Sequence, residues 1–452
     1  VSENNVILHL RSGELVKAVQ LQHIISRIDS DREGKIWLST RGGGGRMFDR
    51  ELNEIDVFLD GEPISSFFED HEGGLWFTSL NSGIFYIPEK RNRVIVPPSM
   101  FRQEKIIDLK TDCYGQLWFS SFNVFGYYDG KRSKTYHIGS SGDTTISRIL
   151  PSPDGKALWL GTNKGFVVHD IISGRSHLNQ NQLKGQHSLL GVKSLLYDSI
   201  QRMLWVGTFA GFYGLRTDGS FTPIYGDKIL NRVEAIESAT GGILYLGSQN
   251  GLYAFNGQSL EAVPSSGLGK LRITALKWRN DSLWIGTRER GLMLLTSDTL
   301  MSFGRKDGLL SSSVNFIELK GKYVVAGTNK GISVIGRDVN SGKLTIIHNI
   351  TSGYGLLANE VSAMTIIGDR IVASSAGFIS YLEVNPDLLM RIRMPCHITS
   401  VRTRNQQIDN PTAEFIELRH NQSSIEINYF AISFFIQGRH TYRHRLLGLE
   451  KD

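Results

Sequence analysis

Residues 70–86 read Asp70-His71-Glu72-Gly73-Gly74-Leu75-Trp76-Phe77-Thr78-Ser79-Leu80-Asn81-Ser82-Gly83-Ile84-Phe85-Tyr86, and this stretch decides the fold. The Asp and Gly residues at its start favour a tight turn. The apolar run around Trp76 has the composition of a strand, and Gly83 permits a second turn because glycine adopts positive φ without strain. The stretch therefore predicts a β-hairpin that follows a turn.

This hairpin pattern recurs along most of the chain, with an aromatic or apolar anchor at the position of Trp76. Successive anchors lie 39 to 47 residues apart, and six of the seven Trp residues occupy this one position. Such a period is typical of repeat folds built from small supersecondary units. The anchors are Trp37, Trp76, Trp118, Trp159, Trp205, Tyr245, Trp284, Val325 and Val372.

Each repeat has room for four short strands. Around Trp159, apolar segments at 146–150, 157–161 and 166–170 are separated by turns, and residues 175–181 leave room for a fourth. Four antiparallel strands in roughly 40 residues predict a propeller blade. Blades must stack because one alone cannot bury both faces. We interpret the aromatic anchors as wedges between blades, with stacking on a ligand as the alternative.

The number of repeats bounds the domain organisation. Nine units run through about Leu382, and residues 1–24 read as the outer strands of another, whereas propellers have about four to eight blades. We therefore expect an all-β chain in three parts: residues 1–105 as terminal blades of a first propeller, 106–385 as a seven-bladed second propeller, and 390–452 as an incomplete Ig-like β-sandwich. A single unusual ring is the alternative.

Composition excludes several classes of function. The formal charge is +6 over 452 residues, without a run of five basic residues, so we expect no nucleic-acid partner. The sequence contains no run of 18 apolar residues, so we expect no membrane-spanning segment in it. Cys113 lies in the first turn of its repeat and Cys396 lies beyond the last repeat, so we expect neither a disulfide between them nor a metal site. The chain begins at Val1 within strand-like sequence, from which we expect a fragment of a longer protein.

The sequence offers no catalytic or metal-binding constellation. The histidines lack the HxH or HExxH spacing of metal sites, and we expect no cofactor. Aspartates recur in the first turn of the repeats, where a cation site or paired carboxylates would be the functional interpretation. Recurrence at one repeat position favours aspartates that hydrogen-bond their own turn. They are Asp31, Asp70, Asp112, Asp154 and Asp198.

The turns after the Trp strands are the candidate ligand-binding positions. In a propeller these turns gather at one face, where loops and clefts bind ligands. Their amides and arginines suit sugar hydroxyls and carboxylates, whereas solvated turn residues are the simpler interpretation of any single one. The candidates are Arg41, Asn81, Asn163, Lys164, Gln249, Arg288, Arg290, Asn329 and Lys330, and Asn123, Phe209, Asn250 and Glu289 lie in the same turns.

Two motifs carry a family resemblance. The pattern Asp-x-x-Gly-x-Leu-Trp-x-Gly/Ser-Thr-x-x-Gly-Leu resembles the two-component regulator propeller repeat. Residues 442–448, Tyr-Arg-His-Arg-Leu-Leu-Gly, resemble the triple-tyrosine domain that follows such propellers, although His444 stands where that domain has its second Tyr. Together the two motifs cover nearly the whole chain.

The resemblance implies the periplasmic sensor region of a membrane-bound histidine kinase, as in hybrid two-component systems of Bacteroides-like bacteria. It further implies a glycan or glycan fragment as ligand, a homodimeric receptor, and a transmembrane helix and kinase after residue 452. This fragment would then not be an enzyme. Two alternatives remain open: a propeller enzyme, lyase or glycoside hydrolase, that acts on polysaccharide, and a protein-binding scaffold.

Overall fold

The computed structural model describes residues 2–433 apart from a set of gaps. Nearly all of the described elements are β-strands, with short 3-10 helices at η3 (Thr240–Gly242), η4 (Arg305–Asp307) and η5 (Ser352–Tyr354). The prediction of an all-β chain is therefore confirmed. The gaps are residues 89, 91, 96–104, 131, 139–143, 179–188, 217–220, 227–229, 265–266, 298, 339–340, 384–395, 404–406 and 410–423.

Three antiparallel sheets begin the chain, and they include the hairpin predicted at residues 70–86. The first sheet contains β1 (Ser2–Glu3), β2 (Val6–Arg11) and β3 (Glu14–Gln20). The second contains β4 (Ile25–Ser30), β5 (Ile36–Thr40), β6 (Gly45–Phe48) and β7 (Glu54–Phe58). The third contains β8 (Ile64–Glu69), β9 (Leu75–Ser79) and β10 (Gly83–Ile87).

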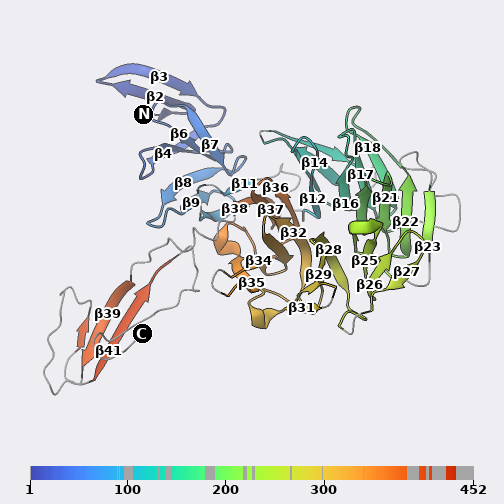
Figure 1. Ribbon diagram of the computed structural model, residues 1–452. Helices are drawn as coiled ribbons and strands as arrows, with labels where there is room; N and C mark the ends of the chain where they lie inside the picture. Colours follow the sequence, from blue (N-terminus) through green and yellow to red (C-terminus); the bar gives the residue numbers. More distant parts are fainter. Residues whose placement is uncertain are drawn as a thin grey trace.

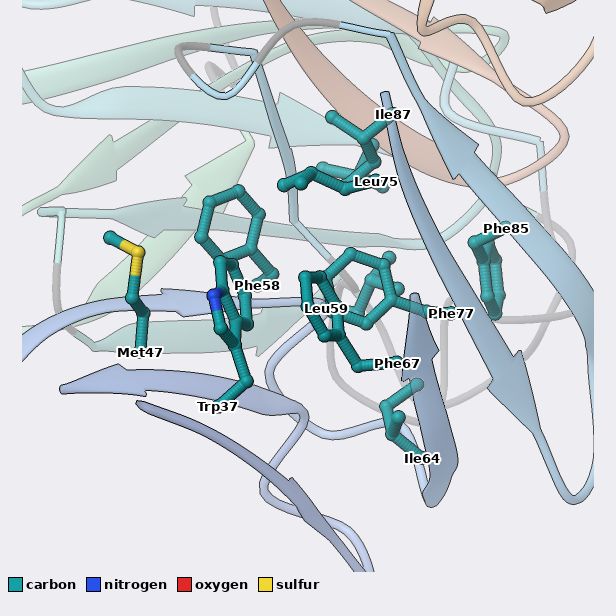
Figure 2. Packing of buried hydrophobic residues seen from close by; sticks show 11 residues of the cluster. Trp37, Met47, Phe58, Leu59, Ile64, Phe67, Leu75, Phe77, Phe85 and Ile87 are labelled. Carbon is teal, nitrogen blue, oxygen red and sulfur yellow. The ribbon is translucent and has the colours of Figure 1, made fainter. Parts of the chain in front are cut away.

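The second and third sheets pack face to face through an aromatic core (Figure 2). The indole of Trp37 is fully buried and stacks on Phe67, with ring centroids 4.1 Å apart. Phe58 and Phe77 close around it at 5.1 and 5.8 Å. Trp37 therefore has the predicted role of a wedge between blades, and burial of an aromatic side chain of this size dominates the packing energy of such an interface.

Seven four-stranded antiparallel sheets follow, which we call the ring. Given from the innermost strand outward, the first three sheets are β12 (Asp108–Thr111), β13 (Leu117–Ser120), β14 (Val124–Tyr128) and β15 (Ser133–His137); β16 (Ile146–Pro151), β17 (Ala157–Thr162), β18 (Gly165–Asp170) and β19 (Arg175–Leu178); and β20 (Ser194–Asp198), β21 (Met203–Gly207), β22 (Gly211–Arg216) and β23 (Phe221–Gly226). The next two are β24 (Ala235–Ser238), β25 (Leu244–Ser248), β26 (Gly251–Phe255) and β27 (Leu260–Ala262); and β28 (Ile273–Arg279), β29 (Ser282–Thr287), β30 (Leu292–Leu295) and β31 (Leu300–Phe303). The last two are β32 (Val314–Lys320), β33 (Tyr323–Thr328), β34 (Gly331–Arg337) and β35 (Leu344–Ile350); and β36 (Ala363–Ile367), β37 (Arg370–Ser375), β38 (Phe378–Glu383) and β11 (Arg93–Ile95).

The ring closes between its first and last sheets (Figure 1). The innermost strand of each sheet contacts that of the next, and β36 contacts β12. An apolar cluster that includes Phe119, Val372 and Ile379 fills this junction. The outer strand of the last sheet, β11, comes from before the first sheet and pairs with β38 in antiparallel register. Residues 93–95 thus add to the ring although they fall in the range predicted for the first propeller.

The recurring aspartates shape the turn before each Trp strand. Asp31 Oδ1 accepts hydrogen bonds from the backbone N–H groups of Glu33 and Lys35, and Asp31 Oδ2 accepts one from Trp37 Nε1 at 3.1 Å. Asp70 and Asp112 repeat this arrangement with their own Trp residues at 2.8 and 2.9 Å. The carboxylates of Asp154 and Asp198 accept from backbone N–H groups of their own turns. The interpretation of these residues as turn-forming is confirmed, and at Asp31, Asp70 and Asp112 the carboxylate also orients the following indole.

The last described sheet contains β39 (Cys396–Thr403), β40 (Gln407–Asp409) and β41 (Ile425–Ala431) in the order β40-β39-β41. These three strands lie within residues 390–452, the range predicted as an incomplete Ig-like β-sandwich. The tyrosine-containing motif at 442–448 lies outside the described residues. Figure 1 shows this sheet in orange and red, separate from the ring.

Candidate functional site

The turns between the second and third strands of the ring sheets lie beside the segments that lead into the innermost strands. Backbone hydrogen bonds join the two: Asn163 N–H donates to Thr145 O at 3.0 Å, Gln249 N–H to Asn231 O at 3.1 Å, and Arg288 N–H to Arg272 O at 3.0 Å. We call this rim of the ring the mouth. It comprises the turns at 163–164, 209–210, 249–250, 288–290 and 329–330 and the lead-in segments that precede β12, β16, β20, β24, β28, β32 and β36.

A buried hydroxyl shapes each of these turns. Thr162 Oγ1 donates to Gly165 O at 2.9 Å and accepts from the Lys164 N–H at 3.1 Å. Ser248 and Thr328 act in the same way in their own turns. Because the hydroxyl satisfies the backbone from inside, the side chains at the tip are exposed. This explains the Gly-Thr part of the repeat motif and places the candidate residues toward solvent.

The structure places seven of the nine predicted site residues at the mouth. Asn163, Lys164, Gln249, Arg288, Arg290, Asn329 and Lys330 all lie in its turns. Arg41 and Asn81 lie in the corresponding turns of the N-terminal sheets, between β5 and β6 and between β9 and β10. These two residues are therefore not part of the mouth.

The mouth and the adjoining strand β16 also contain charged residues that were not among the sequence candidates. Arg148 lies in β16, and Lys193, Arg232 and Arg272 lie in the lead-in segments of the next three sheets. Both oxygens of the nearly buried Glu234 carboxylate accept from arginines: Oε1 from Arg232 Nε and, at 2.7 Å, from Arg272 Nη2, and Oε2 from Arg272 Nε at 3.2 Å. Bidentate pairs of this kind fix arginine geometry.

Phe209 connects two of these cations. Its ring is 49% exposed, with Lys193 Nζ 4.3 Å and Arg232 Cζ 5.0 Å from the ring centroid. Both distances are within the range of cation–π attraction. A Cβ on Gly191 would lie 2.2 Å from Phe209 Cδ2, so the absence of a side chain at Gly191 makes room for the ring. Phe209 thus holds two like charges side by side.

The two sides of the mouth differ in charge balance. Burial, followed by the nearby Arg232 and Arg148 cations, lowers the pKa of Lys193. Among the residues that the structure describes, Lys193 forms no ion pair. Where the ring closes, by contrast, Lys105 Nζ pairs directly with Glu360 Oε1. Uncompensated positive charge is therefore concentrated on the lead-in segments of β20 and β24 and on β16.

A second set of charges lies on the innermost strands. Lys277 Nζ in β28 pairs with Glu318 Oε2 in β32 at 3.1 Å. Glu237 Oε1 in β24 accepts from the Trp278 N–H at 3.0 Å, and burial raises the pKa of Glu237. These contacts join three successive sheets. Both carboxylates are thus engaged by partners from a neighbouring sheet, which is the arrangement of a structural network.

A cleft of about 800 Å³ lies outside the ring, between β2 and the β4–β7 sheet. Its lining mixes apolar side chains such as Ile7 and Leu52 with polar ones, among them Asp29 and Arg50. Asp29 already pairs with Arg27 at 2.9 Å, and none of the predicted site residues lines the cleft. In the described part of the chain, no group of three or more His, Cys, Asp or Glu side chains could hold a metal ion, and no helix is long and apolar enough to cross a membrane.

Comparisons with known proteins show what the fold is similar to. No protein-family model and no curated protein matches the chain. The extracellular domain assigned to the hybrid two-component system BT3049 of B. thetaiotaomicron superposes with a TM-score of 0.66 at 18% identity, over 91% of this chain and 60% of that one. The BT4673 extracellular domain from the same organism superposes with a TM-score of 0.54 at 15% identity, over 89% and 58%.

A further structure of the BT4673 extracellular domain, there described as part of a one-component system, gives a TM-score of 0.51 at 13% identity, over 93% and 62%. The chain thus spans about three fifths of the length of these domains. At such identities the likeness concerns the fold. It shows that a fold of this kind also occurs in solved extracellular domains.

Proposed function

We propose that this chain is part of the extracytoplasmic sensor region of a membrane-bound two-component histidine kinase, and that it binds a glycan or a glycan breakdown product at the mouth. The observation that carries the proposal is the cluster of exposed amide and arginine side chains that the ring sheets present on one rim. Such side chains hydrogen-bond sugar hydroxyls and carboxylates. The similarity in fold to extracellular domains of two-component systems supports the proposed place of this chain in an extracytoplasmic sensor region.

The parts of the receptor follow from this proposal. Residues 1–105, apart from β11, would be the terminal blades of a first propeller, 106–385 with β11 the second propeller, and 390–452 the beginning of a triple-tyrosine domain. The receptor would be a homodimer in the periplasm, with its kinase in the cytoplasm. Ligand binding can shift such a dimer only by the difference in affinity between its two states, so the ligand must bind one arrangement of propeller and C-terminal domain more tightly than another.

A ligand screen on this chain tests the proposal. Differential scanning fluorimetry against neutral and acidic oligosaccharides should reveal at least one class that raises the melting temperature, because a ligand at 100 times its Kd adds about 2.7 kcal/mol to the free energy of unfolding. Isothermal titration calorimetry then gives the affinity. New reducing ends or unsaturated products in the same samples would favour a propeller enzyme, and a flat screen would favour a protein-binding scaffold.

Two variants locate the site. The double substitution Arg288→Ala and Arg290→Ala should weaken binding of any ligand found, whereas Arg41→Ala should not. Arg41 is the matched control because it occupies the same kind of turn, with its N–H donating to Ile24 O as Arg288 N–H donates to Arg272 O, but in an N-terminal sheet. Equal affinities for all three proteins would contradict placement of the site at the mouth.

A further inference from the structure

The charges around Lys193 do not balance. Three cations, Arg148, Arg232 and Arg272, act on its ammonium group, against the single carboxylate of Glu234. That carboxylate already accepts from both Arg232 and Arg272. Like charges held close together in a partly desolvated site raise the free energy of the protein unless an anion joins them. This part of the mouth therefore has the electrostatic form of an anion site.

The cations also retain unused hydrogen-bond donors. Among the described residues, Arg232 uses its Nε toward Glu234, and no protein acceptor takes the hydrogens of its Nη1 or Nη2. Lys193 Nζ faces the Phe209 ring and has no described oxygen acceptor. Guanidinium groups bind carboxylates and sulfates through paired N–H donors. An anion placed against these two side chains would therefore receive several charge-assisted hydrogen bonds.

The backbone at Arg232 gives independent support. Arg232 N–H donates to Phe209 O and Val233 N–H to Thr208 O, just as Gly191 N–H donates to Asn163 O and Val192 N–H to Thr162 O one sheet earlier. This shared position has positive φ, +67° at Gly191 and +56° at Arg232. Glycine adopts such a conformation freely, whereas an L-residue is strained in it. An arginine is thus kept at a position that glycine would occupy without strain.

From these observations we propose that the ligand carries an acidic group, a carboxylate or a sulfate on a sugar, and that Lys193 and Arg232 bind this group beside Phe209. Arg148 and Arg272 strengthen the local positive potential, and Phe209 is a positioning residue that keeps the two cations together. The amides at Asn163 and Gln249 lie in neighbouring turns of the mouth and would bind hydroxyls of the same molecule. The inference rests on the proposed function and makes its substrate class specific.

Four probes separate the possible ligands: an oligogalacturonate tetrasaccharide with carboxylates alone, a sulfated carrageenan tetrasaccharide with sulfates alone, neutral cellotetraose, and inorganic sulfate. We expect calorimetry to show binding of one or both acidic tetrasaccharides at least about 10-fold tighter than cellotetraose, as for loss of one charge-assisted contact. Binding of inorganic sulfate as tight as that of either tetrasaccharide would mean an adventitious ion only, and would overturn the inference.

Arg232→Gly is the decisive variant because it removes the guanidinium and relieves the positive φ at the same time. The affinity for the acidic probe should fall roughly 10- to 100-fold, while the melting temperature stays near that of the parent chain. Arg202→Gly is the matched control. Arg202 also has positive φ, at +49°, but it lies in the turn between β20 and β21, at the end of the sheet away from the mouth.

The pH dependence gives a second measurement. A bound anion favours the charged form of Lys193, whose pKa is lowered in the free protein. Affinity should therefore be full at neutral pH and decline as the pH rises through the Lys193 pKa, and Lys193→Gln should remove this decline. A loss of affinity with rising pH that is the same in Lys193→Gln would contradict the role of Lys193.

The outcomes distinguish the two proposals. If cellotetraose binds and neither acidic probe does, the anion site is wrong while a glycan sensor stands. If an acidic probe binds equally to the parent chain, Arg232→Gly and Lys193→Gln, the ligand is acidic but its acidic group lies elsewhere, and the inference is again wrong. If none of the probes binds to the folded chain, both proposals lose their support.

Discussion

The two sides of the mouth use the same backbone for different purposes. Where the ring closes, Lys105 and Glu360 neutralise each other above an apolar junction that contains Phe119. Across the lead-in segments of β20 and β24, Lys193 and Arg232 gather positive charge around one exposed aromatic ring. The comparison teaches that apolar packing supplies the contact between sheets at the closing junction, whereas charges on the rim elsewhere are available for binding.

The largest expected effect concerns the side of the mouth where the ring closes. Phe119 is 1% exposed and packs in the junction between the first and last sheets. Phe119→Ala should lower the free energy of unfolding by about 3–5 kcal/mol, as for other buried aromatic truncations. Urea denaturation measures this loss. Lys105→Ala is the control, with a loss of less than about 1 kcal/mol because exposed ion pairs contribute little; a larger loss there would mean that the ion pair, and not the apolar cluster, closes the ring.

The next effect concerns the sheet that carries Arg148. His169 in β18 is fully buried against Phe125 and Tyr136, and burial lowers its pKa to about 4. The folded protein thus holds this imidazole neutral, whereas the unfolded chain protonates it near its ordinary value of about 6.5. Stability should be full above about pH 6.5 and fall by roughly 2–3 kcal/mol as the pH drops toward 4.

Urea titrations between these pH values measure the effect, and His169→Phe should flatten the profile since it removes the group that titrates. A profile as steep in His169→Phe as in the parent chain would assign the acid sensitivity to carboxylates instead. This acid effect on stability is also separate from the alkaline effect on binding expected for Lys193.

The smallest expected effect concerns one acidic residue on each side of the mouth, Glu234 beside the basic cluster and Glu360 where the ring closes. Glu234→Gln leaves Arg232 and Arg272 without their shared carboxylate, so we expect a loss of about 1–3 kcal/mol in the free energy of unfolding. Glu360→Gln should cost less than about 1 kcal/mol because its side chain and that of Lys105 are more than half exposed. Chemical denaturation of both variants measures the difference, and equal losses would show that the two sides are not electrostatically distinct.

The predictions from sequence succeeded where neighbouring residues decide the structure. Asp112, its turn and Trp118 lie within seven residues of one another, and this short spacing allows the Trp118 indole to donate its hydrogen bond to the Asp112 carboxylate. The Gly-Thr element before each tip likewise predicts its own turn, because the buried hydroxyl bonds to residues two to four positions ahead. Local chemistry repeated many times gives a strong signal for an all-β repeat fold.

The cluster of basic residues at the mouth could not be recognised from the sequence. Arg148, Lys193, Arg232 and Arg272 are separated by about 40 residues from one to the next, and they lie in segments without a shared motif. The pairing of β11 with β38 is equally hidden, since residues 93–95 and 379–381 are almost 290 positions apart. Only the stacking of successive sheets brings such residues together.

By itself, then, the sequence determined the strand pattern, the turn-forming aspartates and the turns that carry polar tips, because each depends on contacts within one repeat. The tertiary structure alone decided which sheet closes the ring, that Arg41 and Asn81 lie outside the mouth, and that Lys193 and Arg232 share the ring of Phe209. The physical reason is that these features depend on the contact of one sheet with the next, and the rise and rotation between sheets are set by side-chain packing across the whole interface.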